Sequence, residues 1–260
     1  MQPTVRSPRR LLSLAAVLVL ATAPLAAQDA ADLPAAGDVL SRYIEALGGE
    51  DAIRALDNLT WKAKLEMPGM GIEAEMTMKL QAPNRFHVEM SSPAMGSMAQ
   101  GYDGEVAWMD SQMTGPMLLE GDQLEALKLQ GDFYADLNYA VHYPVLETVA
   151  VEEFDGQKCY RLHGETPSGR ESELYFSVDT GLLAGIEGDQ ATPMGDVFVT
   201  IKLGGYEEFG GRLFATEQRQ EVMGAEQIMT LIEADFSAID PSAFELPPAI
   251  RTLVEAGEPG

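Results

Sequence analysis

The residue types that most often carry chemistry are scarce in this sequence. The three histidines, His87, His142 and His163, form no metal-binding pattern such as His-Glu-x-x-His. The single cysteine, Cys159, lies in a predicted strand, where a buried thiol is inert. No nucleophile elbow, Ser-x-x-Lys pair, phosphate-binding loop or dinucleotide-binding motif is present. The sequence therefore predicts a protein that is not an enzyme and that needs no cofactor.

Composition excludes further classes of function. The chain has 260 residues, of which 46% are hydrophobic, so it can bury a substantial core. It carries 41 acidic and 17 basic side chains, with a formal net charge of −24. Nucleic acids and anionic lipid surfaces attract clustered Lys and Arg, so neither is expected as a partner. One cysteine cannot form a disulfide within the chain.

Methionine is the unusual residue. Most of the 14 methionines fall in one segment: Met67, Met70, Met76, Met78, Met90, Met95, Met98, Met109, Met113 and Met117. Several occupy the apolar side of predicted strands, where β-branched residues pack better. Flexible, polarizable methionines suit a surface that adapts to varied apolar partners. Two other interpretations stay open: an ordinary core, and thioether binding of Cu(I), for which Met76 and Met78 share a strand face.

The elements that position these residues follow from periodicity. Apolar residues at helical spacing predict a helix from about Gly37 to a stop at Gly48, with a second helix over Glu50–Leu56. The period then changes to two over Leu59–Met67 and Ile72–Leu80, which are joined by a Pro/Gly turn. Two such runs predict a hairpin with one apolar and one charged face.

Alternating runs continue along the chain to about Asp235. They are interrupted by a helical stretch over roughly Asp122–Gln130 and an irregular stretch over Asp132–Pro144. The pattern predicts a mainly β (α+β) protein, with ten or eleven antiparallel strands in one large curved sheet. Helices must cover its apolar face, leaving either a packed core or a cavity between them.

The first residues resemble a targeting signal. Basic residues precede a short apolar run and a small-residue cleavage site, which predicts a signal peptide over residues 1–27. A linker is expected over 28–36, a single domain over 37–248 and a flexible tail over 249–260. No cysteine lies near the cleavage site, so the mature chain is not expected to be a lipoprotein. It is also expected not to insert stably into a membrane, because no later segment is long and apolar enough.

Short motifs resemble a known family. Lys79–Phe86 (KLQAPNRF), Gly101–Gly104 (GYDG) and Trp108 are similar to segments of the lipoprotein-localisation carriers LolA and LolB. The similarity is greatest to the LolA-like exported proteins called outer-membrane lipoprotein-sorting proteins. Other segments fit the same family: Glu45–Gly49, Thr180–Gly181 and Asp240–Pro247.

This resemblance implies a periplasmic protein with an incomplete antiparallel barrel, whose concave apolar face is lidded by helices and accepts acyl chains. The arginine that precedes the proline in these carriers is Ala82 here, so their arginine-controlled lid closure does not carry over. The expected partners are a hydrophobic or acylated ligand and an envelope protein that donates or accepts it. The residues predicted to line the cavity are Trp61, Leu65, Met76, Met78, Phe86, Val88, Met90 and Trp108.

We thus expect a non-enzymatic carrier or binding protein for a lipid, a lipoprotein acyl chain or another hydrophobic ligand. One alternative is an envelope interaction or sensor module with a filled core, which would act through loops such as Ser91–Met98 or Gly131–Pro144. Another is a methionine-based Cu(I)-binding protein. The volume between sheet and helices distinguishes the first two.

Overall fold

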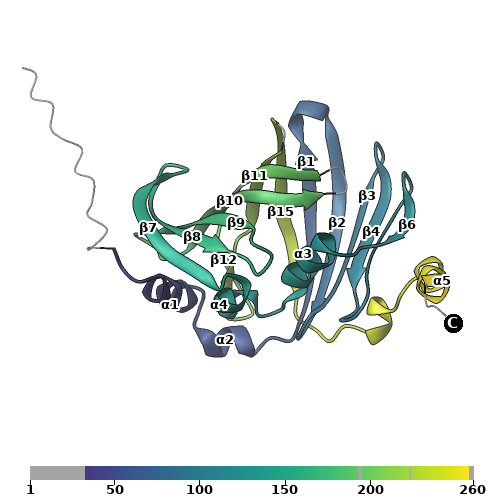
Figure 1. Ribbon diagram of the computed structural model, residues 1–260, viewed down its shortest axis with the longest axis horizontal. Helices are drawn as coiled ribbons and strands as arrows, with labels where there is room; N and C mark the ends of the chain where they lie inside the picture. Colours follow the sequence, from purple (N-terminus) through teal and green to yellow (C-terminus); the bar gives the residue numbers. More distant parts are fainter. Residues whose placement is uncertain (1–32, 193–194, 223, 258–260) are drawn as a thin grey trace, which may run out of the picture.

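The main feature is one curved antiparallel sheet (Figure 1). The computed structural model describes residues 33–192, 195–222 and 224–257. Within these residues the main sheet has 13 strands in the order β6-β5-β4-β3-β2-β1-β15-β14-β11-β10-β9-β8-β7, and a second sheet pairs β12 with β13. The two edge strands, β6 and β7, do not pair with each other in the part of the chain that is described. The predicted fold class, an incomplete barrel with helices, is confirmed.

The first half of the sheet is a meander of hairpins. Its strands are β1 (Asn58–Met67), β2 (Ile72–Gln81), β3 (Arg85–Ser92), β4 (Gly96–Tyr102), β5 (Ala107–Ser111) and β6 (Gly115–Leu118). The predicted β1–β2 hairpin is confirmed, with Trp61 opposite Met78 and Leu65 opposite Ala74. A short 3₁₀ turn, η2 (Pro68–Met70), joins these strands, and Gly71 then adopts a left-handed conformation that glycine tolerates well.

The second half returns to the first through the last strand. Its strands are β7 (Val145–Phe154), β8 (Gln157–Glu165), β9 (Glu171–Ser177), β10 (Leu183–Thr192), β11 (Gly195–Gly204), β14 (Glu217–Val222) and β15 (Ala225–Asp235), while β12 (Glu207–Phe209) and β13 (Arg212–Phe214) form the small hairpin. There are more strands than the sequence predicted. Short strands such as β4 and β6 contain Gly and Pro, which hide the alternation of apolar and polar residues.

Helices lie on the concave face of both halves of the sheet, and one further helix lies beside the edge strand β6 (Figure 1). The helical segments are α1 (Ala36–Ala46), α2 (Glu50–Arg54), α3 (Asp122–Gly131), η3 (Ala135–Leu137), α4 (Tyr139–His142), η4 (Pro241–Phe244) and α5 (Pro248–Gly257). The first three correspond to the helices that periodicity predicted. None of the helices in the described ranges combines the length and the apolar character needed to span a bilayer.

The N-terminal helices fill the concave side of the second half. Tyr43 of α1 and Ile53 of α2 join a buried cluster with Leu174 and Phe176 of β9. Tyr43 packs edge-on against Phe176, with ring centroids 5.2 Å apart. This part of the interior is therefore a packed core, held by apolar burial.

A buried ion pair fastens this core to the β12–β13 hairpin. The guanidinium of Arg212, itself buried, lies 2.6 Å from the carboxylate of Asp136, which also accepts a hydrogen bond from the Tyr43 hydroxyl at 2.6 Å. Burial and the neighbouring Asp136 carboxylate raise the pKa of Tyr43 well above its usual value. The tyrosine therefore stays protonated and acts as a donor to Asp136.

The C-terminal segment differs from the predicted flexible tail. Residues 248–257 form helix α5 beside the edge strand β6, and Ile250 has no exposed surface (Figure 1). Ile250, Leu253 and Val254 form one apolar face of this helix, and that face packs on the sheet. In the sequence, Pro247 and Pro248 instead resemble a closing turn before a flexible end. The predicted signal peptide and most of the predicted linker lie outside the described residues.

Candidate functional site

Seven of the eight predicted residues do share the concave face. Strand pairing sets Trp61 opposite Met78, Met78 opposite Val88, and Met76 opposite Met90. Phe86 lies opposite Leu80 and Leu65 opposite Ala74, in the same alternating rows. Since cross-strand partners point to the same side of a sheet, these side chains form one continuous surface.

Trp108 does not join this set. It lies opposite Gly101, and its ring packs against His87, with centroids 5.6 Å apart, on the convex side of the sheet. Its neighbours Ala107 and Met109 occupy the concave side instead. The predicted role of Trp108 in the cavity is therefore wrong, because the strand that follows the Asp-Gly turn starts at Ala107 and places the tryptophan on the other face.

The convex side around Trp108 is covered by the C-terminal segment. The His87 imidazole donates from Nδ1 to the carbonyl of Ala243, at 2.7 Å, and Trp108 is only 3% exposed. A Cβ atom at Gly101 would lie 2.8 Å from the Trp108 ring, so only glycine fits beneath it. Burial lowers the pKa of His87, which keeps it neutral. Trp108 therefore belongs to a structural cluster.

Helix α3 divides the predicted residues into two groups. Its Leu127 is buried against Phe86, Val88 and Tyr102, with Leu124 packed beside them. Phe86 is consequently only 3% exposed and Val88 only 8%. By contrast Trp61, Leu65, Met76, Met78 and Met90 are half-buried. The apolar residues that remain open to a ligand are those of β1, β2 and the outer part of β3.

Helix α3 spans the concavity from one half of the sheet to the other. It contacts β3 and β4 on one side and β10 on the other, although β10 lies six positions away from β3 in the sheet order. Arg170, in the turn between β8 and β9, donates to Asp122 at the start of α3 at 2.8 Å and to Asp196 of β11 at 3.0 Å. This arginine ties the beginning of the helix to the second half of the sheet.

A row of amides lies on the concave face beside the apolar rows, where the apolar periodicity did not predict it. Gln218 lies opposite Met229, which in turn lies opposite Leu65. Gln220 lies opposite both Ile201 and Gln227. All three glutamines are half-buried. The alternation of glutamine with charged residues along Glu217–Glu221 was the available signal.

No charge interrupts this concave surface. Among the described residues of the rows on β1, β2, β3, β14 and β15, the inward positions carry only apolar, amide or hydroxyl side chains, while Lys62, Lys64 and Glu73 alternate with them on the other side. Such a surface can bind an uncharged amphiphile, whose apolar part contacts methionine and leucine and whose polar part meets the amides.

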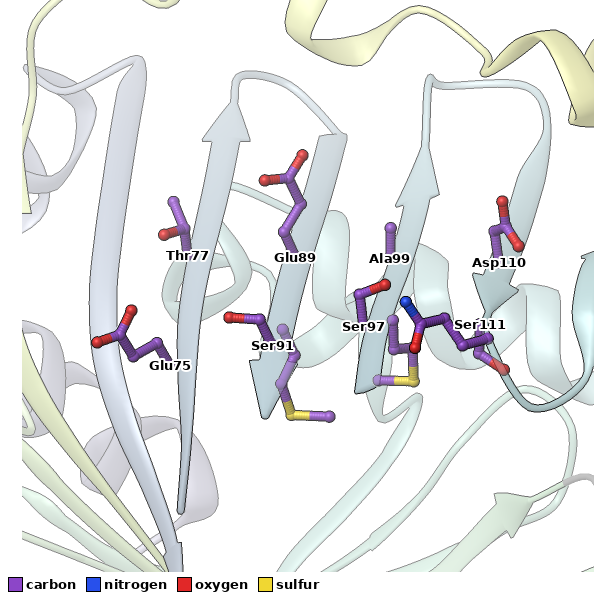
Figure 2. A pocket seen from close by; sticks show the side chains of 11 residues that line it. Glu75, Thr77, Glu89, Ser91, Ser97, Ala99, Asp110 and Ser111 are labelled. Atoms are coloured by element: carbon purple, nitrogen blue, oxygen red, sulfur yellow. The ribbon is translucent and has the colours of Figure 1, made fainter. Parts of the chain in front are cut away.

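Two pockets show where open volume lies. A small one of about 90 Å³ lies between α3 and the sheet, lined by Gln100, Met109, Leu119, Gln123, Ala126, Leu127 and Gln130. A larger hollow of about 480 Å³ lies over β2 to β5 (Figure 2). Its lining residues include Glu75, Glu89 and Asp110, together with Ser91, Ser97, Met90 and Met98. The larger hollow is therefore acidic and unsuited to an acyl chain.

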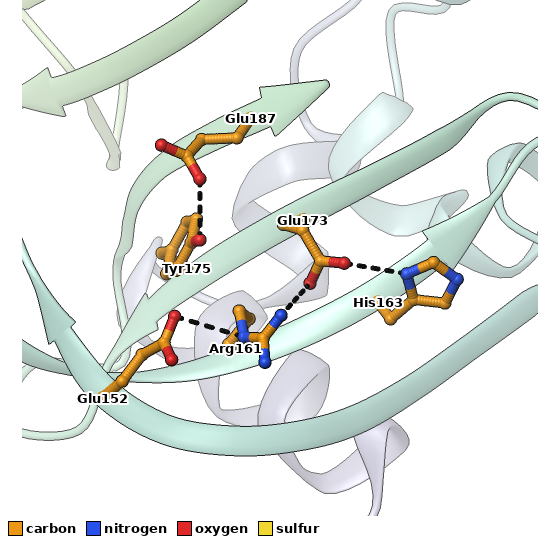
Figure 3. Close-up of polar contacts among 6 residues, drawn as sticks. All are labelled: Glu152, Arg161, His163, Glu173, Tyr175 and Glu187. Atoms are coloured by element: carbon orange, nitrogen blue, oxygen red, sulfur yellow. Dashed lines mark hydrogen bonds and ion pairs between the residues drawn. The ribbon is translucent and has the colours of Figure 1, made fainter. Parts of the chain in front are cut away.

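A polar network covers the convex side of β8 and β9 (Figure 3). Arg161 lies 3.1 Å from Glu152 and 3.2 Å from Glu173, and Glu173 accepts from Nδ1 of His163 at 2.8 Å. The hydrogen bond to Glu173 raises the pKa of His163 above its usual value. Tyr175 donates to Glu187 at 2.8 Å nearby.

The convex network lacks an activated nucleophile. Cys159 precedes Arg161 on the same side of β8, but it is fully buried, and burial raises the pKa of its thiol to about 11. No group of three or more His, Cys, Asp or Glu residues in the described ranges could hold a metal ion. The network therefore links neighbouring strands.

Comparison with known proteins identifies the fold. No protein-family model matches the sequence, and no curated protein matches it. The structure is similar to that of a LolA superfamily protein from Nitrosomonas europaea, with a TM-score of 0.55 and 13% identity over 82% of this chain and 99% of that one. It is also similar to a DUF1329 family protein from Desulfovibrio piger, with a TM-score of 0.54 and 12% identity over 81% of this chain and 97% of that one.

Proposed function

Because the fold is LolA-like, we propose that this chain is a non-enzymatic carrier or binding protein of the periplasm, which holds a lipid, a lipoprotein acyl chain or another hydrophobic ligand on its concave face. The observation that carries the proposal is the charge-free apolar surface of Trp61, Leu65, Met76, Met78 and Met90, which α3 leaves half-exposed.

Apolar burial accounts for the affinity. Each methylene removed from water contributes about 0.8 kcal/mol, so about ten of them contribute roughly 8 kcal/mol before the cost of immobilising the chain. A second acyl chain on the same ligand buries more methylenes and so offsets that cost. Methionine side chains adapt to chains of different length, so the surface selects for apolar character rather than for one structure.

The amide row defines which amphiphiles fit. Gln218, Gln220 and Gln227 offer donors and acceptors without charge, which suits an ester, amide or hydroxyl group next to an acyl chain. Delivery of the ligand to an envelope protein is part of the same proposal.

Native mass spectrometry tests the proposal. We expect the protein, exported with its own leader in a Gram-negative host and purified without detergent, to carry mass adducts that organic extraction identifies as lipid. Met78→Glu and Leu65→Glu each place a charge on the concave face and should abolish the adducts, because burying an unpaired carboxylate is costly.

The matched control is Thr230→Glu, which adds the same charge beside Lys64 on the convex side. It should retain the adducts, and circular dichroism should confirm that all variants fold. An adduct-free parent that also fails to bind a fluorescent long-chain acyl ester would contradict the proposal, as would equal loss of adducts in Thr230→Glu.

One observation favours a second function. Helix α3 seals Phe86 and Val88 completely enough that only about 90 Å³ remains beneath it. An interaction or sensor module would have a filled interior, as this protein has beneath α3. It would bind a partner protein while remaining free of lipid in the same mass spectrum.

A further inference from the structure

Three methionines form a row across neighbouring strands on the concave face. Met76 of β2 lies directly opposite Met90 of β3, and Met90 lies directly opposite Met98 of β4. All three are half-buried. The three residues lie 14 and 8 positions apart in the sequence, on consecutive strands, and the strand register aligns them.

Strand geometry places their thioethers within reach of one another. Directly opposed residues on antiparallel strands have Cβ atoms about 4.5–5.5 Å apart. Residues two apart on one strand, such as Met76 and Met78, are farther apart, at roughly 6.6–6.8 Å. Methionine has three rotatable bonds beyond Cα, so neighbouring sulfurs can converge on one point between them. The cross-strand row is thus a better chelating arrangement than the pair within β2.

Three converging thioethers have a specific chemistry. Thioether sulfur is a soft, uncharged ligand that selects soft cations such as Cu(I) over Mg²⁺, Ca²⁺ or Zn²⁺. The net charge of −24 attracts cations to the molecule without supplying a competing ligand on this face.

Other soft or nitrogen ligands lie elsewhere. His87 points to the convex side, where it bonds to Ala243, and Cys159 is fully buried in the other half of the sheet as a protonated thiol. The groups of His, Cys, Asp and Glu in the described ranges offer no alternative metal site. Any tight binding of a soft cation should therefore depend on methionine.

We infer that Met76, Met90 and Met98 form a binding site for a soft monovalent cation, Cu(I) or its analogue Ag(I). The site lies on the same face as the proposed lipid surface but goes beyond that function, since it needs sulfur rather than apolar area. The test must separate the effect of the sulfur atoms from the effect of apolar side-chain volume.

Anaerobic competition with a Cu(I) chelator provides that test. The purified protein is titrated with Cu(I) in the presence of bicinchoninate, and the experiment is repeated with Ag(I). We expect the parent to withdraw one equivalent of Cu(I). Met90→Leu keeps the size and apolar character of the side chain but removes the central sulfur, so it should weaken binding by about tenfold or more.

Met113→Leu is the matched control, because Met113 is 84% exposed in the turn between β5 and β6, outside the row. It should bind Cu(I) like the parent. Met98→Leu removes an outer sulfur of the row at a position outside the proposed lipid surface. It should weaken Cu(I) binding and leave the lipid adducts unchanged, which separates this inference from the proposed function. A parent that withdraws no Cu(I) or Ag(I), or a Met90→Leu variant as tight as the parent, would overturn the site.

Discussion

His163 is the side chain whose protonation the structure most clearly controls. Its Nδ1 lies 2.8 Å from the Glu173 carboxylate, and this hydrogen bond raises the pKa of the imidazole. Glu171 and Glu165 add smaller effects of the same sign. Glu173→Gln should therefore lower the pKa of His163, which ¹H–¹⁵N NMR of the imidazole measures directly. An unchanged titration would show that the pair does not form in solution.

The same pair makes stability depend on pH in one direction. A histidine whose pKa is higher in the folded than in the unfolded protein stabilises the fold fully below the unfolded value of about 6.5. That contribution is lost as the pH rises through the folded pKa. His163→Asn should consequently lower the free energy of unfolding more at pH 5 than at pH 8.5, as urea denaturation at the two pH values would show.

For single residues, the sequence was sufficient to assign most of the concave side chains to one face of the sheet, but it was not sufficient for Trp108. Strict alternation in β1, β2 and β3 fixes which side chains share a face, and the structure agrees for Leu65, Met78 and Met90. Trp108 follows a turn whose last residue the sequence does not define. A shift of one residue in the start of the strand moves its side chains to the opposite face of the sheet. The methionine row required the register of three strands, which no local pattern contains.

Among the elements, α3 is the helix that covers Phe86 and Val88 on the concave face. Arg170 joins its first turn to β11 through two carboxylates. Pairs with exposed acidic partners contribute up to about 1 kcal/mol, so Arg170→Ala should speed amide hydrogen exchange within Asp122–Gly131 by roughly two- to fivefold. Lys128→Ala, which breaks only the pair with Glu125 inside the helix, is the control. Equal protection in Arg170→Ala and the parent would argue that apolar contacts alone hold α3.

The C-terminal helix α5 tests the correction to the predicted tail. Ile250 is fully buried, so Ile250→Ala leaves a cavity and should lower the free energy of unfolding by about 2–5 kcal/mol. Chemical denaturation measures this, with the exposed Glu255→Ala expected within about 0.5 kcal/mol of the parent. A neutral Ile250→Ala would instead support the flexible tail that the sequence indicated.

Over the whole molecule, local patterns predicted the class of fold but not how its interior is divided. Alternation and helical spacing indicate a curved sheet lined by helices, and that is the architecture observed. They do not show that α1 and α2 fill the second half while α3 closes only part of the first, because those contacts join residues far apart in the chain. The glutamines of β14 were missed for a related reason: their significance depends on which strands flank them.

The pairing of β1 with β15 has a consequence for how the chain acquires this fold. Among the described residues it is the only link within the sheet between the first six strands and the rest. Its partners, such as Leu65 and Met229, are separated by most of the described chain. Closing so long a loop is entropically costly, and distant strand pairing slows folding. Until the last strand arrives, β1 presents an unpaired edge that invites association with other chains. The molecule therefore reaches its final form late, once nearly all of its sequence is present, and early hairpins must be shielded until then.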